Sequence, residues 1–107
     1  MKVLQGTLDL MVLQTLATMG PQHAYAIASR LQQVSRDLLN LNQGTLFPAL
    51  VRLTQQGCIK GKWGKTESGR EAKYYSITSA GEKMLTEETD RWRQLAGVME
   101  RLLDEKV

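Results

Sequence analysis

The spacing of apolar residues changes period along the chain, and this change limits the folds that the chain can adopt. Up to about residue 57, apolar residues recur every three or four positions, as they do on one side of a helix. Residues 58–63 and 72–77 instead show the alternation and the β-forming residues of short strands. Helical spacing returns near residue 79 and continues to about residue 104. The pattern predicts a mainly α-helical fold with one small β-hairpin.

Three helices are predicted ahead of the hairpin, over residues 7–19, 23–34 and 43–56. Gly20 and Pro21 end the first, and Gly57 follows the third, where a left-handed glycine is expected. Between the second and third helices we expect a loop with a short extended piece near Leu39–Leu41. The hairpin should have a long, mobile, basic tip over residues 64–71.

Length and composition indicate one globular domain. The chain has 107 residues, of which 42% are hydrophobic and 23% charged, close to the average of soluble domains. Its single cysteine cannot form an intramolecular disulfide, which fits a reducing compartment. No apolar stretch approaches the ~20 residues that span a bilayer, and the first residues do not resemble a secretory signal. We therefore expect a cytoplasmic protein that does not contact membranes.

Positive charge is concentrated in residues 58–77. This segment holds five basic and two acidic residues, whereas residues 78–107 hold five basic and seven acidic ones. A short basic segment beside a neutral or acidic remainder is consistent either with contact to a polyanion or with an ordinary solvated loop.

Residue groups typical of enzymes are missing from the sequence. His23 is the only histidine and Cys58 the only cysteine, so one chain cannot build a His/Cys metal cluster. No glycine-rich phosphate-binding loop is present. We predict no enzymatic activity, no metal and no cofactor. His23 is expected to make local hydrogen bonds at the start of a helix, and Cys58 to be a small buried apolar residue.

Three helices followed by a basic hairpin form the plan of a winged helix-turn-helix domain. In this plan the third helix enters the major groove of DNA and the hairpin, or wing, follows the neighbouring backbone. With Leu46, Leu50 and Leu53 facing the core, Gly44 and Pro48 project outward, beside Thr45 and Arg52. Thr45 and Arg52 are the predicted base or phosphate contacts, and Gly44 would allow close backbone approach.

Three strings of the sequence resemble the PadR family of bacterial transcriptional regulators. They are His23-Ala24-Tyr25 after Gly20-Pro21, the run from Gln43 to Leu50, and the run from Lys73 to Gly81. The resemblance spans about residues 5–85, and the short acidic C-terminal helix is similar to the small-size branch of the family. Ala24 replaces the usual glycine, and Phe47 replaces a tyrosine whose hydroxyl can bind DNA.

The resemblance implies a dimeric repressor that binds double-stranded DNA and in many relatives is released by a small hydrophobic effector. It aligns Tyr25, Gly44, Thr45, Phe47 and Pro48 with elements that read DNA, and the wing lysines with backbone contacts. The full predicted DNA surface is Tyr25, Gly44, Thr45, Phe47, Pro48, Arg52, Lys60, Lys62, Lys65, Arg70 and Lys73.

The last helix carries a coiled-coil-like line of apolar residues, which we call the seam: Leu85, Trp92, Leu95, Met99 and Leu102. We predict that residues 1–78 form the DNA-binding domain and residues 79–107 a dimerisation helix. The partner's helix should pack on this seam and on Leu4 and Leu8 of the first helix, and a symmetric dimer predicts an inverted-repeat operator. Trp92 either packs only in this interface or also forms the wall of an effector pocket. Ser79 with Glu82 fits a capping box, and Thr78 is the competing cap.

Other functions compete with DNA regulation. Winged helices also serve as protein–protein adaptors, which would not need a basic hairpin. A metal-sensing repressor is disfavoured by the single cysteine and histidine.

Overall fold

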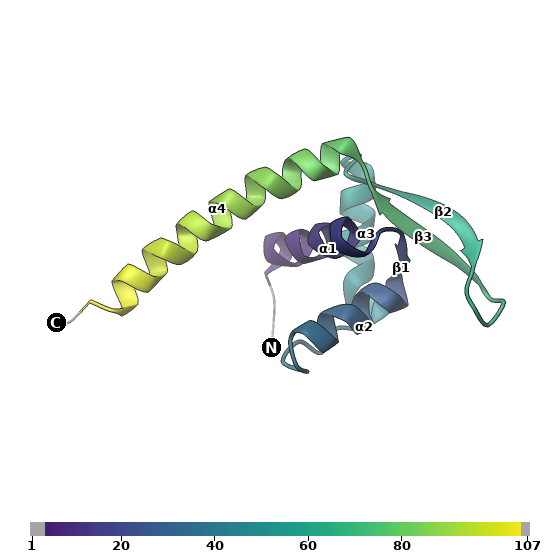
Figure 1. Cartoon of the computed structure of the whole chain (residues 1–107), viewed down its shortest axis with the longest axis horizontal. Helices are drawn as coiled ribbons and strands as arrows, with labels where there is room; N and C mark the ends of the chain where they lie inside the picture. The colour runs from purple at the N-terminus through teal and green to yellow at the C-terminus, as the bar shows by residue number, and fades with distance from the viewer. Residues whose placement is uncertain (1–3, 106–107) are drawn as a thin grey trace.

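The computed structural model describes residues 4–105, which form helices with a small antiparallel sheet at one side of them (Figure 1). In chain order the elements are α1 (Gln5–Met19), β1 (Gln22–His23), α2 (Ala24–Val34), α3 (Gln43–Gln55), β2 (Ile59–Lys65), β3 (Glu71–Ile77) and α4 (Ser79–Leu103). The predicted mainly α-helical winged helix-turn-helix fold with a long last helix is confirmed, and the helix bounds differ from prediction by one or two residues.

The sheet has one strand more than predicted. Its order is β1-β3-β2, with β1 pairing antiparallel to β3 through Gln22 opposite Tyr75 and His23 opposite Tyr74. The predicted extended piece at Leu39–Leu41 joins no strand, and Leu39 is buried instead. A strand of two residues is too short to produce alternation, so periodicity could not reveal β1.

The hairpin of β2 and β3, called the wing below (residues 59–77), has a shorter tip than predicted. Its strands continue to Lys65 and resume at Glu71, so the connection is residues 66–70. The Thr66 N–H donates to the Arg70 carbonyl at 2.8 Å, and Gly69 takes the positive φ of 84° that this turn requires. The glycine and charged residues near the tip concealed the true strand ends.

The core lies where α1, α2 and α3 meet the inner face of the sheet. Its largest fully buried side chains are Leu13, Leu16, Ile27, Leu46, Leu50, Leu53, Ile59 and Val12. The apolar stripe of α1 is buried as its width predicted. Leu8 belongs to this same core and is only 7% exposed. The structure therefore contradicts its predicted place in a dimer interface, because its own protomer already covers it.

Polar side chains cap three helices. The His23 Nδ1 accepts the Ala26 N–H at 3.2 Å, as expected for a histidine at a helix start, and the Asn42 Oδ1 accepts the Thr45 N–H at 2.9 Å. At α4 the cap is Thr78 rather than Ser79. Its hydroxyl accepts the Gly81 N–H and donates to the Gly57 carbonyl at 2.6 Å, a long-range bond that Ser79 does not make here.

The first turn of α4 is the point where this helix joins the body. Gly81 is the buried residue of α4, and a Cβ placed there would lie 2.0 Å from the Cys58 carbonyl oxygen. Met84 and Leu85 pack against the core, after which α4 runs away from the body, towards the yellow C-terminal end in Figure 1. No helix within residues 4–105 is long and apolar enough to cross a membrane.

Candidate nucleic-acid interface

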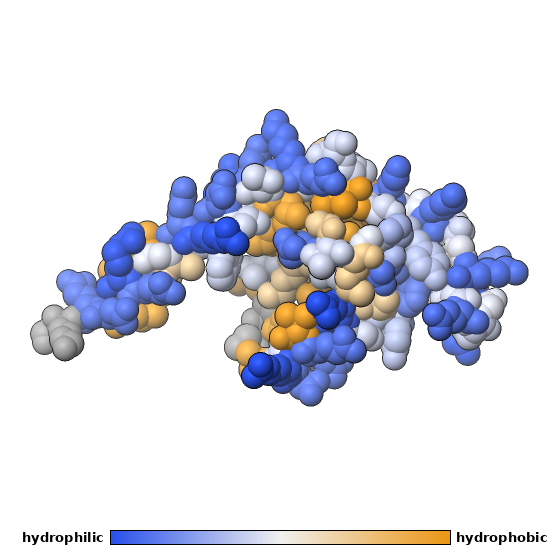
Figure 2. Space-filling view, viewed as in Figure 1, coloured by the Kyte–Doolittle hydropathy of each residue, from blue (hydrophilic) through white to orange (hydrophobic). Residues whose placement is uncertain are grey.

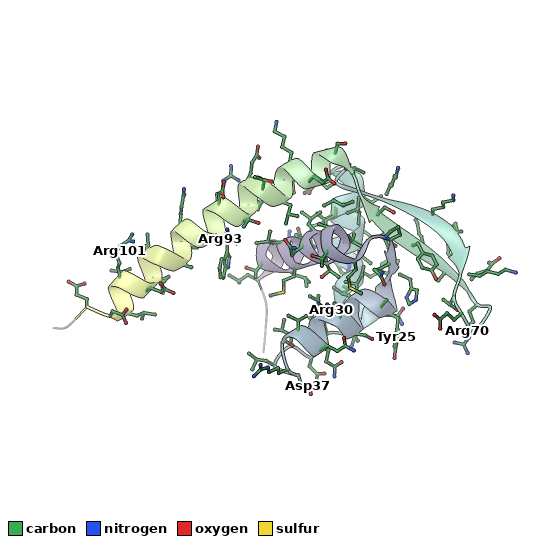
Figure 3. All side chains as sticks on the ribbon, viewed as in Figure 1. Tyr25, Arg30, Asp37, Arg70, Arg93 and Arg101 are labelled. Atoms are coloured by element: carbon green, nitrogen blue, oxygen red, sulfur yellow. The ribbon has the colours of Figure 1, made fainter. Side chains whose placement is uncertain are left out.

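A groove separates the start of α2 and the N-terminal part of α3 from the wing. Its volume is about 1080 Å³, and Tyr25, Phe47, Arg70 and Lys73 from the predicted DNA surface all line it. Figure 3 shows Tyr25 and Arg70 on its two sides, one on α2 and one on the wing tip. Residues from three separate segments therefore meet around one open concavity.

The outward face of α3 is small and polar near its start. Gly44, Thr45 and Pro48 are exposed, as the helical spacing predicted. The Thr45 hydroxyl donates to the Asn42 Oδ1 at 3.1 Å. Since a hydroxyl has one hydrogen, Thr45 can meet a ligand only with its lone pairs while this bond persists.

Arg52 does not belong to this surface. Its guanidinium pairs with Asp9 of α1, with Nη2 2.7 Å from Oδ1 and Nε 3.4 Å from Oδ2. Both side chains are partly buried, at 27% and 17% exposure. The prediction that Arg52 contacts DNA is therefore not supported, because an arginine tied to α1 holds the third helix in place instead. The pairing with Asp9, 43 positions away, could not be inferred from spacing.

The five basic residues of the wing are exposed on both of its faces. Lys60 and Lys62 lie opposite Ser76 and Tyr74, whereas Lys73 lies opposite Trp63 on the face that carries buried Tyr75. The Lys73 ammonium sits 5.9 Å above the Tyr75 ring, at cation–π range. The two ion pairs within residues 4–105 are Arg52–Asp9 and Arg91–Glu88, and neither involves the wing. The five wing cations thus form no ion pair within the described residues, and with Glu67 and Glu71 the wing keeps a net positive charge.

Two groove residues were missed by the sequence analysis. Arg30 of α2 and Trp63 of β2 both line the groove, and Trp63 is 68% exposed. Charge and alternation gave no reason to single out a tryptophan in a strand, since most strand aromatics pack in a core. Only the register of the hairpin places it beside Lys73.

The seam of α4 divides into two parts. Leu85 is partly buried and packs on the core of its own protomer, because the first turns of α4 lie against the body. Trp92, Leu95, Met99 and Leu102 are between 45% and 62% exposed, and Leu4 at the start of α1 is 81% exposed. Figure 2 shows apolar surface along the far part of α4.

A second cavity, of about 500 Å³, lies where α4 faces α1 and α2. Trp92 lines it together with Leu10, Met11, Leu31 and Val34. The structure thus places the candidate effector residue beside a largely apolar cavity.

Burial perturbs two titratable side chains, Cys58 and Tyr75. Burial raises the pKa of the Cys58 thiol and of the Tyr75 phenol, so both stay protonated at neutral pH. Within residues 4–105, no three His, Cys, Asp or Glu side chains gather as metal ligands would.

Three packed helices, a basic wing and an open groove between them define a winged helix-turn-helix protein. The family is specific as well: the model of the PadR-like family of transcriptional regulators matches residues 12–87, so the chain belongs to that family.

Solved structures agree with this assignment. A PadR family transcriptional regulator from Eggerthella lenta is 29% identical, with a TM-score of 0.80, 95% of this chain covered and 86% of the other. A transcriptional regulator from Clostridium thermocellum is 26% identical, with a TM-score of 0.81 and coverage of 91% and 93%. A Streptococcus mutans protein shares the fold at a TM-score of 0.85 and 20% identity, with coverage of 100% and 95%.

Proposed function

We propose that this transcriptional regulator is a homodimeric, sequence-specific repressor that binds double-stranded DNA in the cytoplasm. The observation that carries the proposal is the groove, which Gln43 and Phe47 from the start of α3 line together with Arg70 and Lys73 of the wing. Within residues 4–105, no wing cation forms an ion pair with a carboxylate. A protein–protein adaptor has no need of five exposed cations on one hairpin. A duplex presents the regularly spaced phosphates that match them.

The two sides of the groove have different tasks in this proposal. Wing cations contact phosphates, which sets affinity and orientation without reading sequence. The start of α3 contacts base edges, with Gly44 allowing close approach. The Thr45 lone pairs are suited to accept from an adenine or cytosine amino group, because the hydroxyl hydrogen is held by Asn42. Phe47, 55% exposed, offers only apolar contact, such as with a thymine methyl group.

Assembly follows from the free part of the seam. Trp92, Leu95, Met99 and Leu102 form an apolar strip that one protomer leaves uncovered, and a strip of this kind is an association site. A second copy, packing its α4 against this strip and against Leu4, covers it symmetrically. Two α3 helices about 34 Å apart would then read an inverted repeat.

Release by an effector is proposed to act through the cavity at Trp92. A cavity of about 500 Å³ that is mostly apolar suits a flat hydrophobic compound. Because α4 forms one of its walls, a bound compound would alter how α4 sits against α1.

Selection of bound duplexes from a random pool tests the proposal. We expect an enriched inverted repeat whose binding weakens steeply as salt rises. Lys83→Ala is the matched control, since Lys83 is an exposed cation of α4 outside the groove, and its salt dependence should equal that of the unaltered chain. Failure to enrich any motif, with equal binding to all duplexes, would refute sequence-specific regulation.

A further inference from the structure

Trp63 stands out among the aromatic residues of the wing because residues 4–105 leave most of it exposed. It shares a sheet face with Tyr75, which is only 6% exposed, yet Trp63 itself is 68% exposed. Tyr74, on the other face, donates its hydroxyl hydrogen to the Lys65 carbonyl at 3.1 Å and packs edge-on against His23. The hairpin thus has aromatic support without Trp63.

Trp63 is one of three exposed aromatic residues that meet at the groove. Tyr25 of α2 is 64% exposed and Phe47 of α3 is 55% exposed, and both line the same concavity. The three come from separate elements, so local sequence does not explain their convergence. An apolar ligand surface on the occupant of the groove does.

The charges around Trp63 identify the chemistry of that occupant. Lys73 is its direct cross-strand neighbour, and Arg30 and Arg70 line the same groove. Glu67 and Glu71 line it too, so three cations stand against two carboxylates. A ligand that offers phosphates and apolar carbons at alternating positions satisfies both features, and the sugar–phosphate strand of a duplex is such a ligand. From this we infer that the Trp63 ring packs against a deoxyribose of the DNA strand beside the wing, with Lys73 on an adjacent phosphate. The inference rests on the proposed DNA binding and adds a contact that is independent of both sequence and salt.

Salt dependence separates this contact from the charged ones. Trp63→Ala should weaken binding to specific and random duplexes alike by roughly tenfold, the factor that corresponds to ~1.4 kcal/mol. It should leave the slope of log affinity against log salt unchanged, because no counterion is released at an apolar contact. Arg70→Ala is the comparison variant, since Arg70 is a wing cation that lines the same groove, and it should make that slope less steep by about one.

A second variant keeps the test informative if Trp63→Ala unfolds. Trp63→Lys places a cation at the same point. If this side chain lies against the DNA backbone, the decline of log affinity with log salt should become steeper by about one. In a chain labelled with 5-fluorotryptophan, Trp63 and Trp92 give two ¹⁹F resonances, assigned with Trp63→Phe. The Trp63 resonance should shift on adding the selected duplex.

The outcomes distinguish the inference from the function on which it rests. Absence of DNA binding by the unaltered chain overturns the proposed function and the inference together. Normal affinity of folded Trp63→Ala, an unshifted Trp63 resonance, or an unchanged slope in Trp63→Lys overturns the inference alone. A change in sedimentation of DNA-free Trp63→Ala also overturns it, since the ring would then cover a protein surface.

Discussion

Replacing Gly81 by alanine should loosen the joint between α4 and the winged-helix body. In a helix interior this substitution ordinarily stabilises, by about 1 kcal/mol, because alanine restricts the unfolded chain and favours helix. At Gly81 the new Cβ would lie 2.0 Å from the Cys58 carbonyl oxygen and 2.7 Å from the Ile77 Cγ1. Ordinary contact begins at 3.4 Å, so backbone segments must separate by roughly 1 Å or more.

The size of the effect follows from what that separation disturbs. Overpacking of a tight contact typically costs 1–3 kcal/mol. The same Cys58 carbonyl accepts the Thr78 N–H at 3.0 Å, and weakening that bond adds about 1 kcal/mol. After subtracting the helix-propensity gain, we expect a net loss of about 2 kcal/mol in the free energy of unfolding. For a chain of this length that is a fall of about 10 °C in Tm.

Thermal unfolding followed by circular dichroism measures this loss, with all samples at one protein concentration because dimerisation would shift Tm. Gly97→Ala is the matched control in the same helix. Its new Cβ would meet only the Arg101 Nη1, at 3.6 Å, and position 97 lies off the seam. The Gly97→Ala chain should gain up to about 1 kcal/mol in its free energy of unfolding. A Gly81→Ala chain as stable as the Gly97→Ala chain would refute the argument that the α4 joint requires glycine.

Three further predictions concern the groove and the seam. The double variant Lys65→Ala, Arg70→Ala should bind all duplexes more weakly, and its log affinity should fall less steeply with log salt, by up to about two, in gel-shift titrations. An unchanged slope would show that the wing tip does not contact DNA. The double variant Leu95→Glu, Met99→Glu should sediment as monomers or unfolded chains and should lose operator binding. A variant that remains dimeric and binds normally would refute the proposal that the seam is the dimer interface. Arg52→Ala should lower stability by about 0.5–1 kcal/mol in denaturant titration without altering the salt slope, and a lowered slope would restore Arg52 to the DNA surface.

The architecture could be predicted from the sequence because it depends on local patterns. Helical spacing, the glycine after α3 and the change of period at residue 58 are each visible within a few residues. Strand β1 was missed because two residues show no period. Thr78 was not preferred over Ser79 because its decisive hydrogen bond reaches back to Gly57, 21 positions away.

The candidate site was predictable in outline and not in detail, for a related reason. Exposed residues at the start of α3 and the cations of the wing follow from spacing and charge. Whether an arginine faces DNA or a neighbouring helix depends on where Asp9 lies in space. Likewise, whether Leu8 and Leu85 are free depends on how closely α1 and α4 pack on their own body. The position of Trp63 beside Lys73 follows from the register of β2 against β3, which the sequence alone does not define.

Because α4 is attached to the body near its N-terminal end, a small tilt of this helix produces a large displacement of its C-terminal end. The helix has 25 residues and is therefore about 37 Å long, while its contacts with the core, at Gly81, Met84 and Leu85, lie in its first two turns. A tilt of about 5° at that end moves the other end by about 3 Å, by the geometry of a rigid rod of this length. In the proposed dimer, where the two α4 helices pack together, the same tilt is transmitted to the separation of the two α3 helices. A compound filling the cavity beside Trp92 would press on α4 about halfway along its length, where the displacement is about half of that at the far end.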